Sequence, residues 1–373
     1  EPLEIFVKED GTLSLDFEGC SGPGPNPMNC GIGAMEGGQW VLLTQILIYG
    51  DKVNDGAYFG VEKNYPLGTW CNPGDPYLSY QSPWGNLIPA YTAMMKCCSY
   101  GLFSRGYREE VVPGYGFTGD AIQGGGIYSS GPLEGDRWAL STFEISGQGL
   151  GASAVKDGLD WGYAMWNPES DLGDVETWEL FQGGIPYLSR KIKPNTAGHG
   201  KYRGGANYAG VAMIANSEDV DFFGAREGLV FHGAGGMHGG YPHGTGYRLI
   251  AKNTNMKELI DNQKEYPIDD ADPSNSQFEA LLDADITRKP WAAIYPVMLE
   301  NYDLVHFAMS GGPGYGDPLE RKLRLVKKDL DDGIYTNDLI YKVYGVVAEY
   351  DKEKEEWKID EEATRTRKEE MKN

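Results

Sequence analysis

Residues 193–207 read Lys-Pro-Asn-Thr-Ala-Gly-His-Gly-Lys-Tyr-Arg-Gly-Gly-Ala-Asn, and strand-like runs flank them at 187–192 and 207–214. Glycine allows tight turns and a close approach of two backbones. The whole chain shares this composition, because 52 of its 373 residues are glycine, roughly twice the usual share. The stretch therefore predicts short strands joined by tight, glycine-rich turns.

Further strand-like runs lie at 138–145, 228–231 and 304–309, which indicates a β-rich middle of the chain. Nearer the start, apolar residues alternate at 3–7 and 13–17 around Asp10-Gly11 and predict a hairpin. Apolar residues at helical spacing predict helices over 40–47 and 87–103. Cys97 and Cys98 fall within the second helix, where packing is a better interpretation than chemistry.

The last third of the chain predicts helices and a second hairpin. Asp317-Pro318 is typical of a helix start and Gly333 of its end, and a shorter helix follows over 336–344. Residues 346–350 then face 357–359 as a hairpin, and a charged helix runs from Asp360. The fold class is therefore α+β, with a glycine-laden β-rich middle flanked by helices and hairpins. We divide it into segments 1–110, 111–260 and 261–373.

Charge and composition exclude several functional classes. The formal net charge of −22 disfavours nucleic-acid binding, and no apolar run approaches the ~20 residues of a membrane span. The five cysteines are an odd number without CxxC spacing, which predicts a reducing, cytoplasmic location rather than a disulfide framework.

The 193–207 stretch is also the main candidate binding loop. It places Asn195, His199, Lys201 and Arg203 among glycines in an otherwise acidic chain. An arginine can grip a carboxylate or phosphate through two parallel hydrogen bonds. The alternative is structural, with Arg203 tied to one of the many carboxylates and fixing a turn.

Two other glycine-rich stretches carry weaker signals. His232, His238 and His243 lie close together, but their spacing matches no metal motif, so we assign no metal ligand in this chain. Residues 310–316 lie between a strand and a helix start without a nucleotide fingerprint, which favours a structural turn over a site wall.

Eight short motifs together resemble the hydantoinase B family, most closely its acetone and acetophenone carboxylase members. They lie, in chain order, at 51–58, 123–126, 155–158, 164–169, 193–198, 200–205, 316–321 and 343–347. Each motif alone is weak, but their order along the chain is specific. The family's large subunit extends further on its N-terminal side and the chain begins without methionine, so the resemblance implies the C-terminal portion of such a subunit.

The resemblance implies an ATP-dependent ketone carboxylase that joins an activated enol phosphate to CO2 or bicarbonate within a multi-subunit enzyme. A hydantoinase A-like partner would bind ATP and Mg²⁺, the upstream portion would hold Mn²⁺, and a small partner subunit would hold Zn²⁺. On this basis Lys201 and Arg203 are expected to hold a phosphorylated or carboxylated intermediate, with Asn195 and Gln123 as neutral donors. No catalytic residue is assigned.

Two alternatives remain open at this point. The family also includes ATP-dependent cyclic-amide hydrolases of the hydantoinase or oxoprolinase type. The segment is also compatible with a non-catalytic scaffold that only docks partner subunits.

Overall fold

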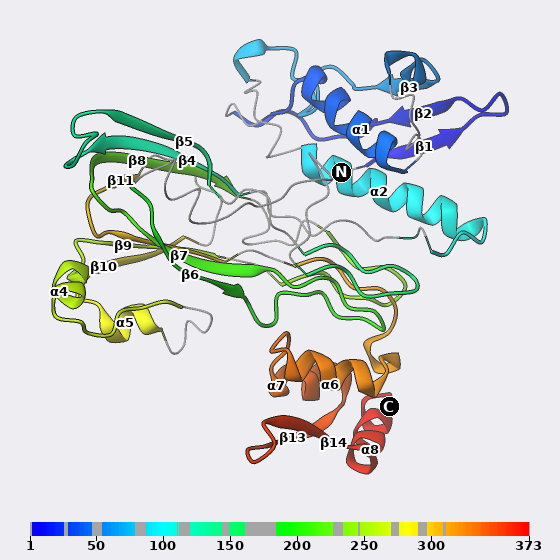
Figure 1. The fold of residues 1–373 in the computed structure, drawn as a ribbon. Helices are drawn as coiled ribbons and strands as arrows, with labels where there is room; N and C mark the ends of the chain where they lie inside the picture. Colours follow the sequence, from blue (N-terminus) through cyan, green and yellow to red (C-terminus); the bar gives the residue numbers. More distant parts are fainter. Residues whose placement is uncertain are drawn as a thin grey trace.

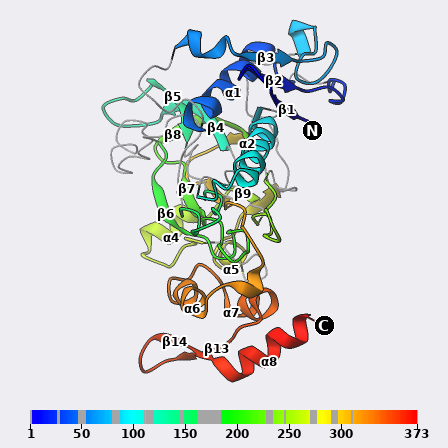
Figure 2. The ribbon, with the colours of Figure 1, turned by 90° about the vertical axis from the view of Figure 1, so that its right-hand side faces the viewer.

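The structure is a computed structural model that describes residues 2–25, 29–46, 54–78, 87–109, 111, 120–143, 149–160, 184–226, 234–244, 247–269, 276–289, 297–308 and 311–372. It has an N-terminal unit, a middle part of two sheets and a C-terminal unit, stacked in that order (Figure 2). The mixture of helices and sheets confirms the α+β prediction. The predicted strand 228–231 and the motif 164–169 lie outside the described residues.

The N-terminal unit is a small sheet covered by two helices. Its strands pair in the order β1 (Glu4–Val7), β2 (Leu13–Asp16) and β3 (Val61–Asn64). β1 and β2 form the predicted hairpin, whereas β3 runs parallel to β2. The helices α1 (Ile32–Ile46) and α2 (Leu87–Ser104) pack on this sheet around Leu15, Leu43 and Met94.

Short 3-10 turns, η1 (Asp55–Tyr58) and η2 (Pro76–Leu78), complete the unit. The α2 prediction is confirmed. Helix α1 begins well before the predicted residue 40, because three glycines and Glu36 hide its apolar periodicity from a sequence pattern.

The middle part is a sandwich of two antiparallel sheets (Figure 1). Its described residues form the strands β4 (Asp120–Tyr128), β5 (Arg137–Phe143), β6 (Tyr187–Ile192), β7 (Tyr208–Met213), β8 (Ser217–Arg226), β9 (Tyr247–Lys252), β10 (Asp285–Lys289), β11 (Val297–Leu299) and β12 (Leu304–Ala308). One sheet has the order β10-β9-β12-β7-β6 and the other β11-β8-β4-β5.

Strand β7 shows why the five-stranded sheet is stable. All six of its residues are buried, since Tyr208 and Ala212 pack between the two sheets while Val211 and Met213 face the opposite side. That side is covered by α4 (Met256–Asp261) and α5 (Gln277–Leu281). A strand covered on both faces loses the alternation of apolar and polar residues, which is the pattern of 207–214 in the sequence.

Strand pairing crosses the predicted segment boundary at residue 260. β9 lies before it and β10 after it, yet they pair in one sheet, with Ile250 opposite Thr287. β12 then inserts between β9 and β7. The middle of the molecule is therefore built from both segments 111–260 and 261–373.

The C-terminal unit packs its own small core around Val326, Ile340 and Tyr344. It comprises η4 (Pro318–Glu320), α6 (Leu323–Asp331), α7 (Asn337–Leu339), the π-helical η5 (Ile340–Tyr344), β13 (Val347–Asp351), β14 (Glu356–Asp360) and α8 (Glu361–Lys372). β13 and β14 form the predicted hairpin, and α8 is the predicted charged helix.

The helix predicted from Asp317 differs from the observed one. The Asp317 carboxylate caps the N–H of Leu319 at 2.8 Å, but the capped turn is only η4. Arg321 and Lys322 then adopt extended backbone, and α6 begins at Leu323. Arg321 is buried in ion pairs, so a tertiary contact overrides the local helix signal.

Candidate functional site

Four glycine-rich loops meet between the five-stranded sheet and α6, beyond the ends of β6 and β7 (Figure 1). We call these loops, residues 149–160, 195–207, 236–244 and 311–317, the glycine hub. Backbone hydrogen bonds join them: Gly205 N–H to Leu150 O at 2.7 Å, Gly198 N–H to Gly312 O at 2.8 Å, Gly312 N–H to Gly205 O at 2.9 Å, Tyr241 N–H to His199 O at 2.7 Å and Gly314 N–H to Tyr241 O at 2.9 Å. The hub thus fixes segments that are far apart in sequence without forming a sheet.

The backbones of the hub lie too close together for side chains. A Cβ on Gly204 would lie 1.8 Å from the carbonyl oxygen of Gly312, and one on Gly205 would lie 1.8 Å from that of Leu159. Real Cβ contacts essentially never fall below 3.0 Å. Much of the glycine surplus is therefore explained by close backbone approach, and residues 311–316 belong to the hub.

A buried chain of charges ties the hub to the C-terminal unit. It runs through Asp160, Arg203, Asp329, Arg321 and Asp157, and we call it the Asp329 network. Its ion-pair distances are 2.6 Å from Arg203 Nη1 to Asp160 Oδ1, 2.8 Å from Arg203 Nε to Asp329 Oδ1, 2.7 Å from Arg321 Nη2 to Asp329 Oδ2 and 2.7 Å from Arg321 Nη1 to Asp157 Oδ1.

The network is buried at its centre and open at its ends. The side chains of Arg321 and Asp329 are 0% and 3% exposed, whereas those of Asp157 and Asp160 are 24% and 36% exposed. Burial raises the pKa of Asp329, and the two arginines oppose that shift. The pKa of Arg203 is raised, since its partners Asp160 and Asp329 outweigh the cost of burial. Both guanidiniums therefore stay charged.

A second polar group lies beside the network. Tyr344 donates to the hydroxyl of Tyr335 at 3.2 Å, and that hydroxyl lies 3.3 Å from Nδ1 of His199 and donates to Ala197 O at 3.2 Å. Burial lowers the pKa of His199 to about 4 and raises that of Tyr344 to about 12. At neutral pH these side chains are uncharged, so this group orders the 195–207 loop without adding charge.

The two candidate cations of the 193–207 loop have different surroundings. The guanidinium of Arg203 is occupied by Asp160 and Asp329, which are the contacts of the structural alternative. Lys201 is exposed at 40% and pairs with the exposed Glu320 at 3.0 Å. Exposed pairs of this kind exchange partners at little cost. Of these two cations, Lys201 is therefore the one open to an anionic ligand.

The two candidate neutral donors lie in different parts of the fold. The Asn195 amide accepts from the Thr336 N–H at 3.0 Å and donates to its hydroxyl at 3.2 Å, so it joins the hub to the start of α7. Its φ of 63° is left-handed, a conformation that asparagine tolerates better than most residues. Gln123 lies on β4 opposite Phe223, in the other sheet, and its side chain lies outside the described part of the structure.

The two described histidines of the 232–243 group are separated by their packing. His238, at a φ of 51°, stacks with Phe103 of α2 at 4.4 Å between ring centroids and with Tyr315 at 5.3 Å. His243 is buried, with Nδ1 at 2.9 Å from Gly244 O. His232 lies outside the described residues. Within the described ranges, no group of three or more His, Cys, Asp or Glu side chains is arranged to hold a metal ion.

Sequence reasoning missed most of the Asp329 network. Asp157 and Arg321 lie in motifs that carry the family resemblance, but 164 positions separate them along the chain. Asp329 lies in α6 among other acidic residues and carries no local signal. Only a tertiary structure brings these side chains together.

Residues 2–318 match the sequence profile of the hydantoinase B/oxoprolinase family. The chain belongs to this family. It is 41% identical over 348 residues, or 93% of its length, to the acetone carboxylase alpha subunit of Xanthobacter autotrophicus. It is 25% identical over 316 residues, or 82% of its length, to the acetophenone carboxylase delta subunit of Aromatoleum aromaticum. The hydantoinase B resemblance inferred from the motifs is therefore confirmed.

Two solved structures show the same fold. A nucleotide-free structure of acetone carboxylase matches the whole chain with a TM-score of 0.92 and 39% identity. An ATP-dependent caprolactamase from Pseudomonas jessenii matches 98% of the chain with a TM-score of 0.72, but at 17% identity this likeness concerns the fold alone. The chain spans 44% and 43% of the two curated relatives and 48% and 56% of the two structures.

Proposed function

We propose that this chain is part of the large subunit of an ATP-dependent ketone carboxylase of the acetone or acetophenone type. The observation that carries this proposal is the 41% identity to an acetone carboxylase alpha subunit across 93% of the chain. The structural match to acetone carboxylase, at 39% identity over the whole chain, supports it. The C-terminal position within that subunit is part of the proposal.

The chemistry explains why such an enzyme needs a closed, multi-subunit site. A neutral ketone is a poor carbon nucleophile and bicarbonate a poor electrophile, so ATP activates both, as an enol phosphate and a carboxyphosphate. Carbon–carbon bond formation then requires exclusion of water, which would hydrolyse these species. In this scheme the glycine hub supplies a rigid wall, because interlocked backbones hold their positions without side chains that move.

We assign different roles to the candidate residues of the 193–207 loop. Lys201 meets the anionic intermediate, since its exposed pair with Glu320 is easily exchanged. Arg203 is a positioning residue that keeps the loop in place through Asp160 and Asp329. Asn195 aligns the same loop through Thr336, and Gln123 remains a proposed neutral donor from β4.

The partners and cofactors belong to the same proposal. A hydantoinase A-like subunit binds ATP and Mg²⁺, the remainder of the large subunit holds Mn²⁺, a small subunit holds Zn²⁺, and the assembly is cytoplasmic. The described residues supply no metal-ligand group, so no step is assigned to a metal in this chain. The described helices include none long and apolar enough to cross a bilayer.

Bicarbonate incorporation tests this function. The chain is purified with the subunits that accompany it, and ¹⁴C-bicarbonate is supplied with ATP and either acetone or acetophenone. Ketone-dependent and ATP-dependent fixation of label into a 3-oxo acid is expected. ATP hydrolysis without fixation for any ketone tested would contradict the proposal.

A cyclic-amide hydrolase is the second candidate, since an ATP-dependent caprolactamase has the same fold, although the fold by itself does not fix the reaction. This enzyme would open caprolactam, hydantoin or 5-oxoproline in the presence of ATP without incorporating bicarbonate. The same preparation therefore separates the two reactions. A scaffold without a catalytic role would leave this chain unlabelled when an activated substrate analogue is crosslinked to the complex.

A further inference from the structure

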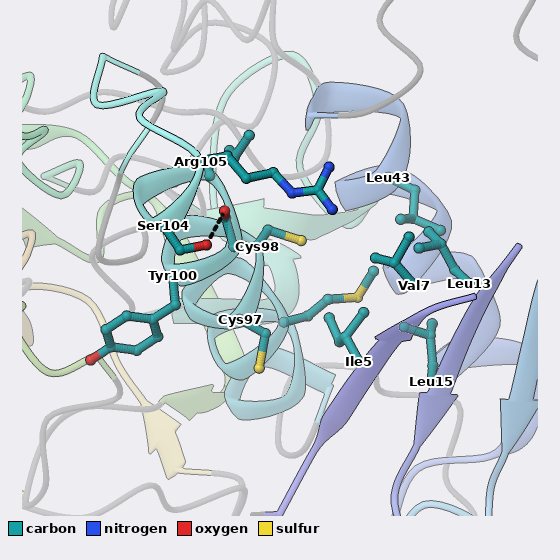
Figure 3. A pocket seen from close by; sticks show the side chains of 13 residues that line it. Ile5, Val7, Leu13, Leu15, Leu43, Cys97, Cys98, Tyr100, Ser104 and Arg105 are labelled. Carbon is teal, nitrogen blue, oxygen red and sulfur yellow. Dashed lines mark hydrogen bonds between the residues drawn. The ribbon is translucent and has the colours of Figure 1, made fainter. Parts of the chain in front are cut away.

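The N-terminal unit contains a deep apolar slot between its hairpin and α2 (Figure 3). One wall is a single face of the hairpin, formed by the alternating residues Ile5, Val7, Leu13 and Leu15. The opposite wall is one face of α2, where Met94, Cys98, Gly101 and Arg105 follow each other at helical spacing. The volume is about 750 Å³, within the range of small-molecule binding sites.

The slot is closed at the bottom and open at the top. Leu15 and Met94 are fully buried and Leu43 of α1 is 1% exposed, so they form the floor. Val7, at the mouth, is 62% exposed. The sheet and the helix therefore pack against each other only at the floor of the slot. Toward the mouth, apolar side chains remain in contact with solvent. Covering them with a ligand would be favourable, because it removes apolar surface from water.

Two polar side chains of the α2 wall, Ser104 and Cys97, are already used within the chain. The Ser104 hydroxyl donates to Gly101 O at 2.8 Å, and the Cys97 thiol donates to Leu3 O at 3.7 Å. Burial raises the pKa of Cys98 to about 11, so this side chain is a neutral, apolar thiol at physiological pH. The walls thus offer apolar contact and few hydrogen bonds.

Arg105 is the single charged residue among those that line the slot. Its guanidinium extends over the slot toward Leu43 (Figure 3). This guanidinium forms no ion pair and no side-chain hydrogen bond with any described residue. The guanidinium is the positive charge at an otherwise apolar slot, and its fork geometry suits a carboxylate.

We propose that the slot binds a small amphipathic carboxylate, with an aliphatic or aryl body between the hairpin and α2 and the carboxylate on Arg105. A small molecule fits better than an extended peptide, since the slot has the volume of a small-molecule site and lies between the face of the hairpin and α2, whereas a peptide strand pairs along a sheet edge. The slot borders the glycine hub, since Tyr100 of its α2 wall contacts His238 and Leu102 packs near Met237. The proposal nevertheless does not depend on ketone carboxylation.

Calorimetry with a matched pair of ligands tests the site. 4-Phenylbutyrate and 4-phenyl-1-butanol share the aryl body and differ in the anionic head. The full chain, in the assembly in which it is purified, is expected to bind one 4-phenylbutyrate and to bind the alcohol more weakly. Arg105→Gln is expected to weaken the affinity for 4-phenylbutyrate by about 3- to 10-fold and to leave the affinity for the alcohol unchanged. Arg365→Gln on α8 removes the same charge from another exposed site and should change neither affinity.

Gly101 provides the steric test. Open space surrounds the position of its missing Cβ, so Gly101→Phe fills the slot and Gly101→Ala adds only a methyl group. Loss of binding of both ligands in Gly101→Phe, with binding retained in Gly101→Ala, supports the proposal. The absence of saturable binding, or binding that survives Gly101→Phe, would overturn it. Loss of a co-purifying subunit in Gly101→Phe without any ligand binding would assign the slot to a polypeptide and would also overturn it.

Discussion

Arg203 donates from Nε to Oδ1 of Asp329 at 2.8 Å, although 126 positions separate the two residues. Arg321 binds the other oxygen of the same carboxylate at 2.7 Å. Asp329 therefore holds one arginine from the glycine hub and one from the start of the C-terminal unit. A single carboxylate on α6 links two parts of the fold.

Asp329→Asn should destabilise the fold by about 3–5 kcal/mol, because it leaves two buried guanidiniums facing a neutral amide. Urea unfolding, followed by circular dichroism, measures the change. Asp332→Asn is the matched control, since Asp332 is on the same helix end and pairs with exposed Lys328. A loss no larger than that of the control would contradict the structural role of the network.

Gly204→Ala should prevent closure of the glycine hub, because the added Cβ would lie 1.8 Å from Gly312 O. We expect insoluble protein or loss of the cooperative thermal transition. Gly37→Ala on α1 is the control, since nothing lies within 4 Å of its Cβ position and alanine favours helix by about 1 kcal/mol. Equal melting temperatures for the two variants would show that the hub tolerates side chains.

Stability should fall as the pH drops from about 6.5 toward 4, in part because of His199. Burial lowers its folded pKa from 6.5 to about 4, so in this window the unfolded chain binds a proton that the folded chain does not. The contribution of His199 to stability is complete above the pKa that its imidazole has in the unfolded chain, and it is lost as the pH falls from about 6.5 toward 4. His199→Gln removes this proton uptake, so its stability should depend less steeply on pH. Parallel curves for the two proteins from pH 7 to 4.5 would exclude the contribution.

Lys201→Ala should slow ketone carboxylation by about 10- to 100-fold while reducing ATP hydrolysis by the complex less, since the lost cation would contact the intermediate formed after ATP is used. Initial rates of label fixation and of phosphate release measure the two effects. Lys328→Ala removes another exposed lysine with an acidic partner and should change neither rate. Equal loss of both rates in Lys201→Ala would indicate an effect on assembly instead. Arg203→Ala is less informative, because it also breaks the Asp329 network.

Local signals predicted many elements well. The hairpin of β1 and β2, helix α2, the strands β6, β7 and β12, and the hairpin of β13 and β14 all follow from periodicity and turn residues. Strands β3, β4, β8, β9, β10 and β11 were missed because they carry charged residues, contain glycines or are short. The Gly124–Gly126 run in β4 predicted tight turns, and this was wrong. The order of strands in the sheets was not predictable from local pattern, since each pairing joins distant residues.

The candidate site was predictable only in part. Glycine and charge marked residues 193–207, and that loop does lie in the hub. The partners of Arg203 were not predictable, because Asp160 and Asp329 are two of 55 acidic residues and nothing local distinguishes them. The predicted start of α6 was wrong because it too depends on a distant contact. The ion pairs of Arg321 interrupt the helix predicted from Asp317.

The glycine hub also constrains how the polypeptide acquires its shape during synthesis. Residues 311–317 complete the hub. The loops at 149–160 and 195–207 therefore cannot form all their hub contacts until the more than one hundred residues between 207 and 311 have been synthesised. Contacts so distant along the chain form slowly. The hairpin and helices of the first hundred residues have their own apolar core and can fold early. The five-stranded sheet, in contrast, is complete only after β12 has been translated, and the hub only after residue 317.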